Sequence, residues 1–321
     1  MAVTILDIAA AANCNASTVS RALRDDPRIT PERKKLIRQL AMDMNYIPNR
    51  IAKQLADGKT KLVLFVIGEL EFEHTAPIAS ALDHELEEFG YILTIMPNSL
   101  REGKFHNIIS LCEQRFCDAA VLFSPPAQPD DLPSFNRLLA NKFPIVCVDQ
   151  YLKNYPFPAL TNDARLSINL LGQKMLDAGM NIGLTLFPNL NTTAEFRLNE
   201  SEKFLDSLDI PHIRTLEELP ELLKKYPNAN LGIFADNPSI DGLNDIMIKH
   251  RHVRCIGGMF DSWKFNAPEC FDTIFLCLQD VTTAGKLAGE YIVRMLRGDD
   301  SIEKVTMIPP ASIITPHIKK Y

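Results

Sequence analysis

Residues 15–21, Asn-Ala-Ser-Thr-Val-Ser-Arg, bring amide, hydroxyl and guanidinium groups together in one short run with helical spacing. In a helix over this run, Val19, Ala22 and Leu23 form the apolar face, so small and polar side chains point outward. Such groups can hydrogen-bond to base edges in the major groove, and an arginine there can contact guanine with two bonds. The candidate DNA-contacting residues of this run are Asn15, Ala16, Ser17, Thr18, Ser20 and Arg21.

The residues before this run predict a first helix and a tight turn. Thr4 and Asp7 have the spacing of a capping box, and the apolar positions of residues 5–12 recur on one helical face. Asn13 and Cys14 then form the turn, since Asn tolerates a positive φ better than most residues with a side chain. With Asn15 as N-cap, the segment predicts a helix-turn-helix, whose second helix enters the major groove.

A third helix and a short hinge segment follow. Thr30 is a predicted N-cap with Pro31 at the first helical position, and an apolar stripe follows at Leu36, Ile37, Leu40, Ala41 and Met44. Pro48 then interrupts the helical pattern. Residues 49–56 have helical character, but a helix this short is marginal alone in water.

Charge is divided unevenly along the chain. Residues 1–60 contain ten Lys and Arg against six Asp and Glu, a net charge of +4, although the whole chain carries −6. The remainder therefore carries 24 basic against 34 acidic residues, a net charge of −10. A small basic head on an acidic body fits a nucleic-acid-binding module joined to a domain with another role.

From Lys61 onward, apolar strand-like runs alternate with helical patterns, which predicts parallel sheets covered by helices on both faces. The predicted strands are 62–67, 91–96, 119–123, 144–148, 182–187, 231–235, 253–256 and 273–278. A break in strand order near residue 160 favours two lobes. Open sheets of this kind bind ligands beyond the carboxyl ends of their strands, so a cleft between the lobes is the expected small-molecule site.

Several other classes of protein lack support in the sequence. The seven cysteines form no Cys-x-x-Cys pair, so we expect reduced thiols and no metal site. No nucleophile-elbow, zinc-protease or dinucleotide-binding motif is present, so we expect neither catalytic residues nor a cofactor. No secretion signal and no membrane-spanning run is evident, and we expect a cytoplasmic protein.

Three runs resemble the lactose/galactose repressor family of bacterial transcription regulators: residues 3–9, residues 17–21 and Asn45-Tyr-Ile-Pro-Asn-Arg-Ile-Ala-Lys-Gln-Leu55. The likeness is close over residues 3–60 and looser to about residue 316. Asn13 and Asn15 depart from the Gly and Ser that are usual in the family. The resemblance implies that residues 49–56 order on operator DNA and that Leu55 is a minor-groove wedge. It also implies DNA contacts by Thr4, Asn49 and Arg50.

The resemblance further implies a periplasmic-binding-protein-like effector domain with ligand-binding residues at matching positions. Asp149 follows a predicted strand, Arg197 stands where the family has a cleft-facing Arg, and Gln279 belongs to a family Gln-Asp/Pro pair. Asp236-Asn237 inverts the usual order, and Phe260-Asp261 replaces a common Asp-Asp. The candidate effector-binding residues are Asp149, Arg197, Asp236, Asp261, Trp263 and Gln279. Each of them has an ordinary surface, capping or core role as its alternative.

The sequence thus predicts an α/β protein with an all-α head at 1–47, a hinge and linker at 48–60 and an effector and dimerisation domain at 61–321. Lobe one is expected at about 61–160 plus 292–321, and lobe two at about 161–291. The expected function is a homodimeric, DNA-binding transcriptional regulator, most simply a repressor, that binds pseudo-palindromic operator DNA under control of a sugar or other hydroxylated metabolite. A transporter's solute-binding protein and a sugar-processing enzyme are the alternatives. The first would carry a secretion signal in place of the basic head, and the second a catalytic motif.

Overall fold

The computed structural model describes most of the chain and divides it into two compact units, Met1–Thr60 and Lys61–Tyr321. The described residues are 3–47, 58–67, 74–97, 104–123, 132–149, 156–187, 192–236, 240, 242–260, 269–299 and 301–316. The predicted hinge helix at 49–56 lies outside them. We call the first unit the head and the second the body.

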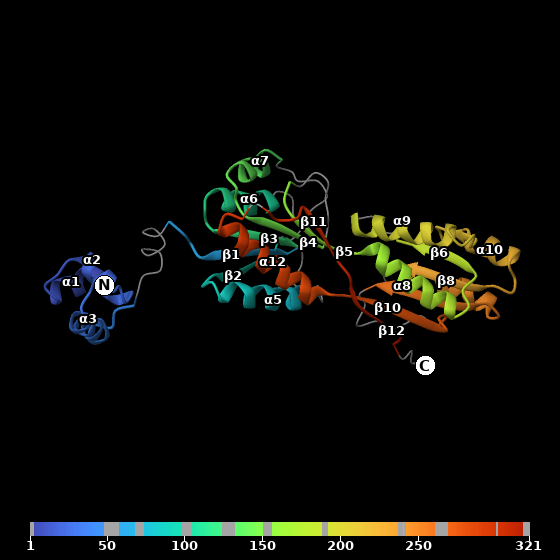
Figure 1. Ribbon diagram of the computed structural model, residues 1–321. Coiled ribbons are helices and arrows are strands. Elements are labelled where there is room, and N and C mark those ends of the chain that lie inside the picture. The colour runs from blue at the N-terminus through green and yellow to red at the C-terminus, as the bar shows by residue number, and fades with distance from the viewer. Residues whose placement is uncertain are drawn as a thin grey trace. The chain divides into compact units, whose positions relative to one another are not determined.

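The described part of the head contains three helices around a small core (Figure 1): α1 (Ile5–Ala11), α2 (Ala16–Leu23) and α3 (Pro31–Asp43). The Thr4 backbone N–H and hydroxyl both donate to the Asp7 carboxylate at 2.8 Å, which confirms the predicted capping box. The Thr30 hydroxyl accepts from the Arg33 N–H at 3.4 Å, as the N-cap prediction requires. The fully buried side chains are those of Ile8, Val19, Ala22 and Ile37.

The predicted apolar stripe of α3 is wrong at Leu36. Ile37 and Ala41 are buried in the head core, whereas the Leu36 side chain is 47% exposed. Leu36 stands one residue before Ile37, which turns it about 100° around the helix and away from the core.

The first lobe of the body is built on a six-stranded parallel sheet in the order β11-β5-β4-β3-β1-β2. Helices α5 (Thr75–Glu87) and α12 (Val281–Leu296) cover one face, and α6 (Lys104–Glu113) and α7 (Leu132–Ala140) cover the other (Figure 1). The strands are β1 (Leu62–Ile67), β2 (Ile92–Pro97), β3 (Ala119–Phe123), β4 (Ile145–Asp149), β5 (Ala159–Asn162) and β11 (Val305–Ile308).

The second lobe has a similar plan, with strand order β12-β10-β9-β8-β6-β7, and only β12 runs antiparallel to its neighbour. Helices α8 (Ala164–Asp177) and α9 (Thr192–Asp206) pack on one face, and α10 (Leu219–Lys225) and α11 (Leu243–Met247) on the other. A short 3₁₀ turn, η1 (Ile248–His250), follows α11. The strands are β6 (Ile182–Leu186), β7 (His212–Ile213), β8 (Asn230–Ala235), β9 (Arg254–Phe260), β10 (Thr273–Gln279) and β12 (Pro310–Ile314). The predicted α/β fold with two lobes and largely parallel sheets is confirmed.

The predicted division of the lobes differs from this arrangement at its C-terminal part. Helix α12 packs on the first lobe along its whole length from Val281, whereas the return to lobe one was expected only at about residue 292. Its close contact with α5 depends on Gly285, where a Cβ would lie 2.5 Å from the Ile78 carbonyl oxygen. Strand β12 lies in the second sheet, although lobe one was expected to continue to residue 321. Four strands, β5, β7, β11 and β12, were not predicted.

Candidate DNA-binding face and ligand pocket

The candidate DNA-contacting side chains of the head lie along α2 and at the start of α1. Ser17 and Arg21 are exposed and four residues apart, so they share one face of α2. Asn15 and Thr4 are also exposed, and each precedes the first residue of a helix. The candidate side chains with partial burial are Ala16, Thr18 and Ser20. Asn49, Arg50 and Leu55 lie outside the described residues.

The turn between α1 and α2 is held by backbone conformation and by an arginine from α3. Asn13 has φ +46°, the positive value that the sequence predicts. The Arg33 guanidinium donates to the carbonyl oxygens of Ala12 and Asn13 at 3.1 and 3.2 Å, and so satisfies groups left unpaired at the end of α1. Asn15 is the N-cap residue of α2, but its side chain makes no capping hydrogen bond.

Ion pairs in the head occupy basic residues away from this face of α2. A hydrogen bond from Lys34 lowers the pKa of Asp25, with a further contribution from Arg38. Hydrogen bonds from Arg28 lower the pKa of Asp26. Arg21 takes no part in these hydrogen bonds, although its charge also contributes to the lowered pKa of Asp26.

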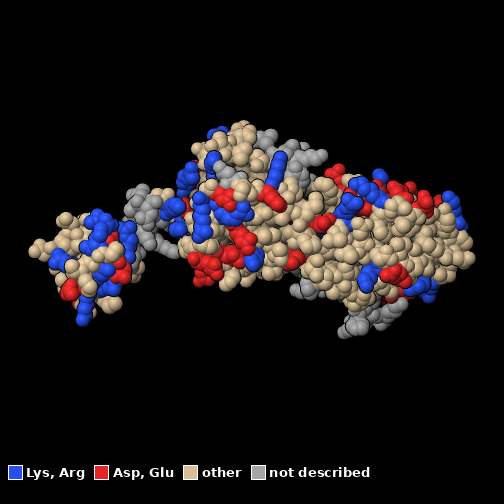
Figure 2. All heavy atoms as spheres, in the orientation of Figure 1, with Lys and Arg blue, Asp and Glu red and all other residues tan. Residues whose placement is uncertain are grey.

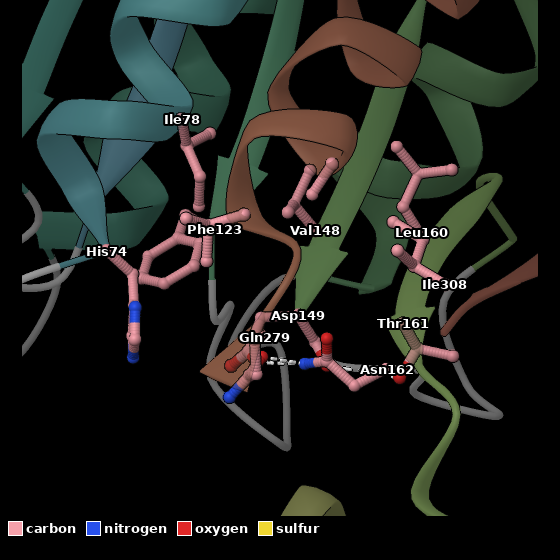
Figure 3. Close-up of a pocket in the computed structure, with 12 residues that line it drawn as sticks. His74, Ile78, Phe123, Val148, Asp149, Leu160, Thr161, Asn162, Gln279 and Ile308 are labelled. Carbon is pink, nitrogen blue, oxygen red and sulfur yellow. Dashed lines mark hydrogen bonds between the residues drawn. The ribbon is translucent and has the colours of Figure 1, made fainter. Parts of the chain in front are cut away.

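In the body, a small pocket lies at the carboxyl ends of the first-lobe strands (Figure 3). Its apolar wall is formed by Ile78, Phe123, Val148, Leu160 and Ile308, whereas His74, Asp149, Asn162 and Gln279 supply polar groups. The Asn162 amide donates to Gln279 Oε1 and, at 3.4 Å, to Asp149 Oδ1. Figure 3 shows these three side chains close together where the strands end. Asp149 has φ +78°, a conformation that is unusual for a residue other than glycine.

A second polar cluster lies in lobe two. Arg197 of α9 is only 6% exposed, and its Nη1 lies 2.6 Å from Oδ1 of Asp236, directly after β8. The guanidinium carbon is 4.0 Å from the ring centroid of Phe260 at the end of β9. The Phe260 ring therefore covers one face of the guanidinium, and the Asp236 carboxylate accepts a hydrogen bond from its Nη1.

The two lobes meet between these clusters. The Thr193 hydroxyl, near the start of α9 in lobe two, donates to the Asp149 carbonyl oxygen at 3.3 Å. Gln279 ends β10 of the second sheet and yet contacts Asn162 of the first. An opening or closing of the lobes must change these contacts.

Four of the six predicted effector-binding residues are described, and they fall into two pairs. Asp149 lies with Gln279 in the first-lobe pocket, and Arg197 lies with Asp236 in the second lobe. Asp261 and Trp263 lie outside the described residues. Sequence reasoning missed Asn162, His74 and Phe260. Asn162 ends the unpredicted strand β5, where its only sequence signal was its place just before the helix-capping Asp163.

Within the described ranges, no group of three His, Cys, Asp or Glu side chains is arranged to hold a metal ion. The helices in those ranges also include none with the length and apolar character to cross a bilayer.

Comparisons with known proteins identify relatives of both units. The model described as "Bacterial regulatory proteins, lacI family" matches residues 4–49. The ribose operon repressor of Bacillus subtilis is 24% identical over 248 residues, which cover 76% of this chain and 73% of that protein. The transcriptional regulator KdgR of the same species is 22% identical over 220 residues, 68% of this chain and 64% of its own length. The lac repressor dimer, solved with operator and the anti-inducer ONPF, superposes with a TM-score of 0.74 at 17% identity, over 98% of both chains.

Proposed function

We propose that this chain is a member of the lacI family of bacterial regulatory proteins and a sequence-specific DNA-binding transcriptional regulator, acting as a repressor. The observation that carries the proposal is the exposed face of α2, within the family match, where Ser17 and Arg21 stand one helical turn apart. The regulator acts as a homodimer, because one head reads too few base pairs for a unique operator.

The DNA contacts divide into base reading and positioning. Arg21 and Ser17 face base edges or the flanking phosphates, and Thr4 and Asn15 bind phosphate at helix N-termini. Asn49, Arg50 and Leu55 of the hinge segment complete the interface, with Leu55 inserted as an apolar wedge in the minor groove. Insertion of the wedge costs a few kcal/mol of base unstacking, which the contacts of the bent duplex offset.

A small molecule bound between the lobes controls the affinity for the operator. Asp149 and Gln279 line the first-lobe pocket, and Arg197 with Asp236 lies in the second lobe. Two carboxylates favour a neutral or cationic hydroxylated ligand, such as a sugar, over an anion. A ligand that binds one lobe arrangement more tightly shifts the population toward it, and this shift changes the spacing of the two heads in the dimer. Asp261 and Trp263 are further proposed contacts.

In this proposal the protein is a regulator and not an enzyme, in line with relatives that are transcriptional regulators. It acts in the cytoplasm, where the chromosome is accessible. The body supplies allosteric control and the dimer interface.

The test of DNA recognition begins with selection of genomic fragments bound by the purified protein, followed by gel shifts on the selected site. Arg21→Ala should lower affinity for that site by about 5- to 150-fold, the equivalent of a bidentate guanine contact, and change affinity for random DNA far less. Lys35→Ala is the matched control, because it removes one exposed positive charge from α3. Equal losses on selected and random DNA would reduce Arg21 to a phosphate contact. A wild-type protein without any preferred fragment would refute the proposed function.

The test of the effector site is a thermal-shift screen of sugars, nucleosides and other hydroxylated metabolites. A ligand at a hundred times its dissociation constant stabilises the body by about 2.7 kcal/mol. The best ligand should also alter the gel shift. If Asp149→Asn and Gln279→Ala both leave the thermal shift and the effect on DNA binding intact, the pocket assignment is wrong.

A further inference from the structure

Four basic residues lie at the end of the first sheet where its strands begin, on a body that is acidic overall. They are Lys61 before β1, Arg115 before β3, Lys142 before β4 and Arg297 just after α12. We call this set the basic edge. Figure 2 shows Lys and Arg side chains gathered at the end of the body where the chain enters β1. Arg115, Lys142 and Arg297 are exposed, and Lys61 is half-buried.

The contacts show that the first part of the basic edge is one continuous surface. The Lys61 ammonium lies 4.0 Å from the ring centroid of Tyr91 and donates to the Phe89 carbonyl oxygen at 3.4 Å. The Arg297 guanidinium lies over the Phe89 ring at 4.5 Å. Burial raises the pKa of Tyr91, and Asp118 raises it further, whereas the charge of Arg297 lowers it. Lys61, Arg297 and Asp118 are therefore neighbours of one ring.

The parallel sheet brings the other two cations to the same edge. The Lys61 N–H donates to the Asp118 carboxylate at 3.0 Å, which connects the start of β1 to the segment of Arg115. The Arg115 guanidinium then lies 5.8 Å from the ring of Phe143, the residue after Lys142. Aromatic rings thus lie beside cations at three points of the basic edge and hold them in place.

Backbone conformation is a second observation that sets three residues of the basic edge apart. Eight described residues other than glycine have positive φ, and five are Asn or Asp, which tolerate this conformation. The other three are Lys61, Arg115 and Lys142, with φ values of +58°, +59° and +51°. Glycine is the residue that normally ends a helix in this conformation, as Gly298 does after α12. Three long cations occupy positions where glycine would be less strained, all on one edge.

We propose that the basic edge binds the phosphate backbone of duplex DNA beside the site that the head contacts. This inference rests on the proposed function, because the head must hold the body close to DNA. Guanidinium and ammonium groups are the side-chain groups that bind phosphates most strongly. Acidic residues also lie near the set: Asp118 accepts the Lys61 N–H, and Glu87 and Glu88 stand at the end of α5.

Chain connectivity keeps the basic edge near the DNA. Lys61 belongs to the edge and is also the first residue of the body, and residues 48–60 join it to the end of the helical head. Thirteen residues span at most about 45 Å when fully extended. A weak phosphate contact then becomes intramolecular once the head is bound, so even two or three cations contribute at a high effective concentration.

The experiment compares the full-length protein with a double variant, Arg115→Gly and Lys142→Gly. Glycine removes each charge at a backbone position that it prefers, so thermal stability should be unchanged or higher. The probe is a random-sequence duplex of about 40 base pairs, longer than two half-sites one helical turn apart. Affinity is measured between about 50 and 200 mM NaCl. The slope of log affinity against log salt should become shallower by about 0.9 for each phosphate that the variant no longer neutralises, or about 2 or more for a dimer.

Two controls separate a local contact from a change in total charge. Lys249→Gln with Arg251→Gln removes the same charge from exposed residues between α11 and β9 in lobe two, and should leave the salt slope unchanged. Arg115→Lys with Lys142→Arg keeps the charges and should retain the wild-type slope. A glutamine version of the double variant should reproduce the effect of glycine, which excludes a folding artefact.

The outcomes distinguish this inference from the function on which it rests. If the wild-type protein binds DNA and the glycine variant has the same salt slope, the basic edge does not contact DNA, although the proposed function stands. If the salt slope of the lobe-two control variant becomes shallower by the same amount, the effect depends on total charge alone and the inference is overturned. A wild-type protein that does not bind DNA at all removes the proposed function and the inference together.

Discussion

Replacement of Asp236 by Asn should destabilise the body more than replacement of Arg197 by Met, although both changes break the same ion pair. The two partners differ in exposure: the Arg197 side chain is 7% exposed and that of Asp236 is 37% exposed. Without the guanidinium, water can solvate the carboxylate. Without the carboxylate, the guanidinium keeps its charge where water hardly reaches it, and this is the costlier result.

The magnitude follows from the geometry. Unit charges about 4 Å apart interact by about 4 kcal/mol at the effective dielectric constant typical of pairs near a protein surface. Because more than a third of Asp236 is exposed, solvent screening reduces this to a net coupling of about 1–2 kcal/mol. Asp236→Asn should therefore cost about 2–3 kcal/mol. Arg197→Met should cost about 1 kcal/mol, since a flexible thioether still packs on the Phe260 ring.

The assay is equilibrium unfolding in urea at pH 7, followed by circular dichroism, on the full chain with both single variants and the double variant. The head and the body can unfold separately, so the transition of the body is fitted by itself. The double-mutant cycle gives the coupling directly, and it should shrink in 1 M NaCl because the pair is partly exposed.

Two results would refute this reasoning. A coupling near zero would mean that the short Nη1–Oδ1 contact contributes no net stability. A larger loss for Arg197→Met than for Asp236→Asn would mean that contact with the ring, rather than the charge pair, is the dominant interaction of this guanidinium.

Three further predictions concern other parts of the body. Gly285→Ala should lower the melting temperature of the body, because the new Cβ would lie 2.5 Å from a backbone oxygen of α5 and force the two helices apart; calorimetry should show a cost of about 1–3 kcal/mol. Cys270 should react with iodoacetamide before Cys255, as peptide mass spectrometry can show, since the hydrogen bond from Cys255 lowers the pKa of Cys270 whereas burial raises that of Cys255 well above its usual range. Hydrogen bonds from Ser301 lower the pKa of Asp299 from 3.8 to about 2, so its stabilising effect is present above pH 3.8 and lost as the pH falls toward 2. The difference in melting temperature between wild type and Asp299→Asn should follow the same course.

The sequence by itself determined the features that depend on a few neighbouring residues. The Thr4–Asp7 capping box, the positive φ of Asn13 and the Thr30 cap were all predicted correctly, because each rests on contacts within four residues. Buried strands such as β1 were also predictable, since parallel strands covered on both faces are apolar throughout. The resemblance to one family also supplied the candidate site residues, whose roles stay predictions.

Tertiary structure decided which elements join which lobe. Helix α12 packs beside α5, about 200 residues earlier in the chain, and its glycines gain meaning only from that contact. The short strands β5, β11 and β12 have little periodicity to detect, and they are strands because a neighbouring edge supplies their hydrogen bonds.

Tertiary structure also decided how the candidate ligand-binding residues are used. Their types suggested hydrogen bonding to a ligand, but the sequence could not show that Arg197 is covered by Phe260 and paired with Asp236. It also could not show that three basic residues with a left-handed backbone conformation, Lys61, Arg115 and Lys142, lie at the same end of one sheet. Both facts depend on strand order, which is set by apolar packing between distant segments, whereas capping and periodicity act only along the local chain.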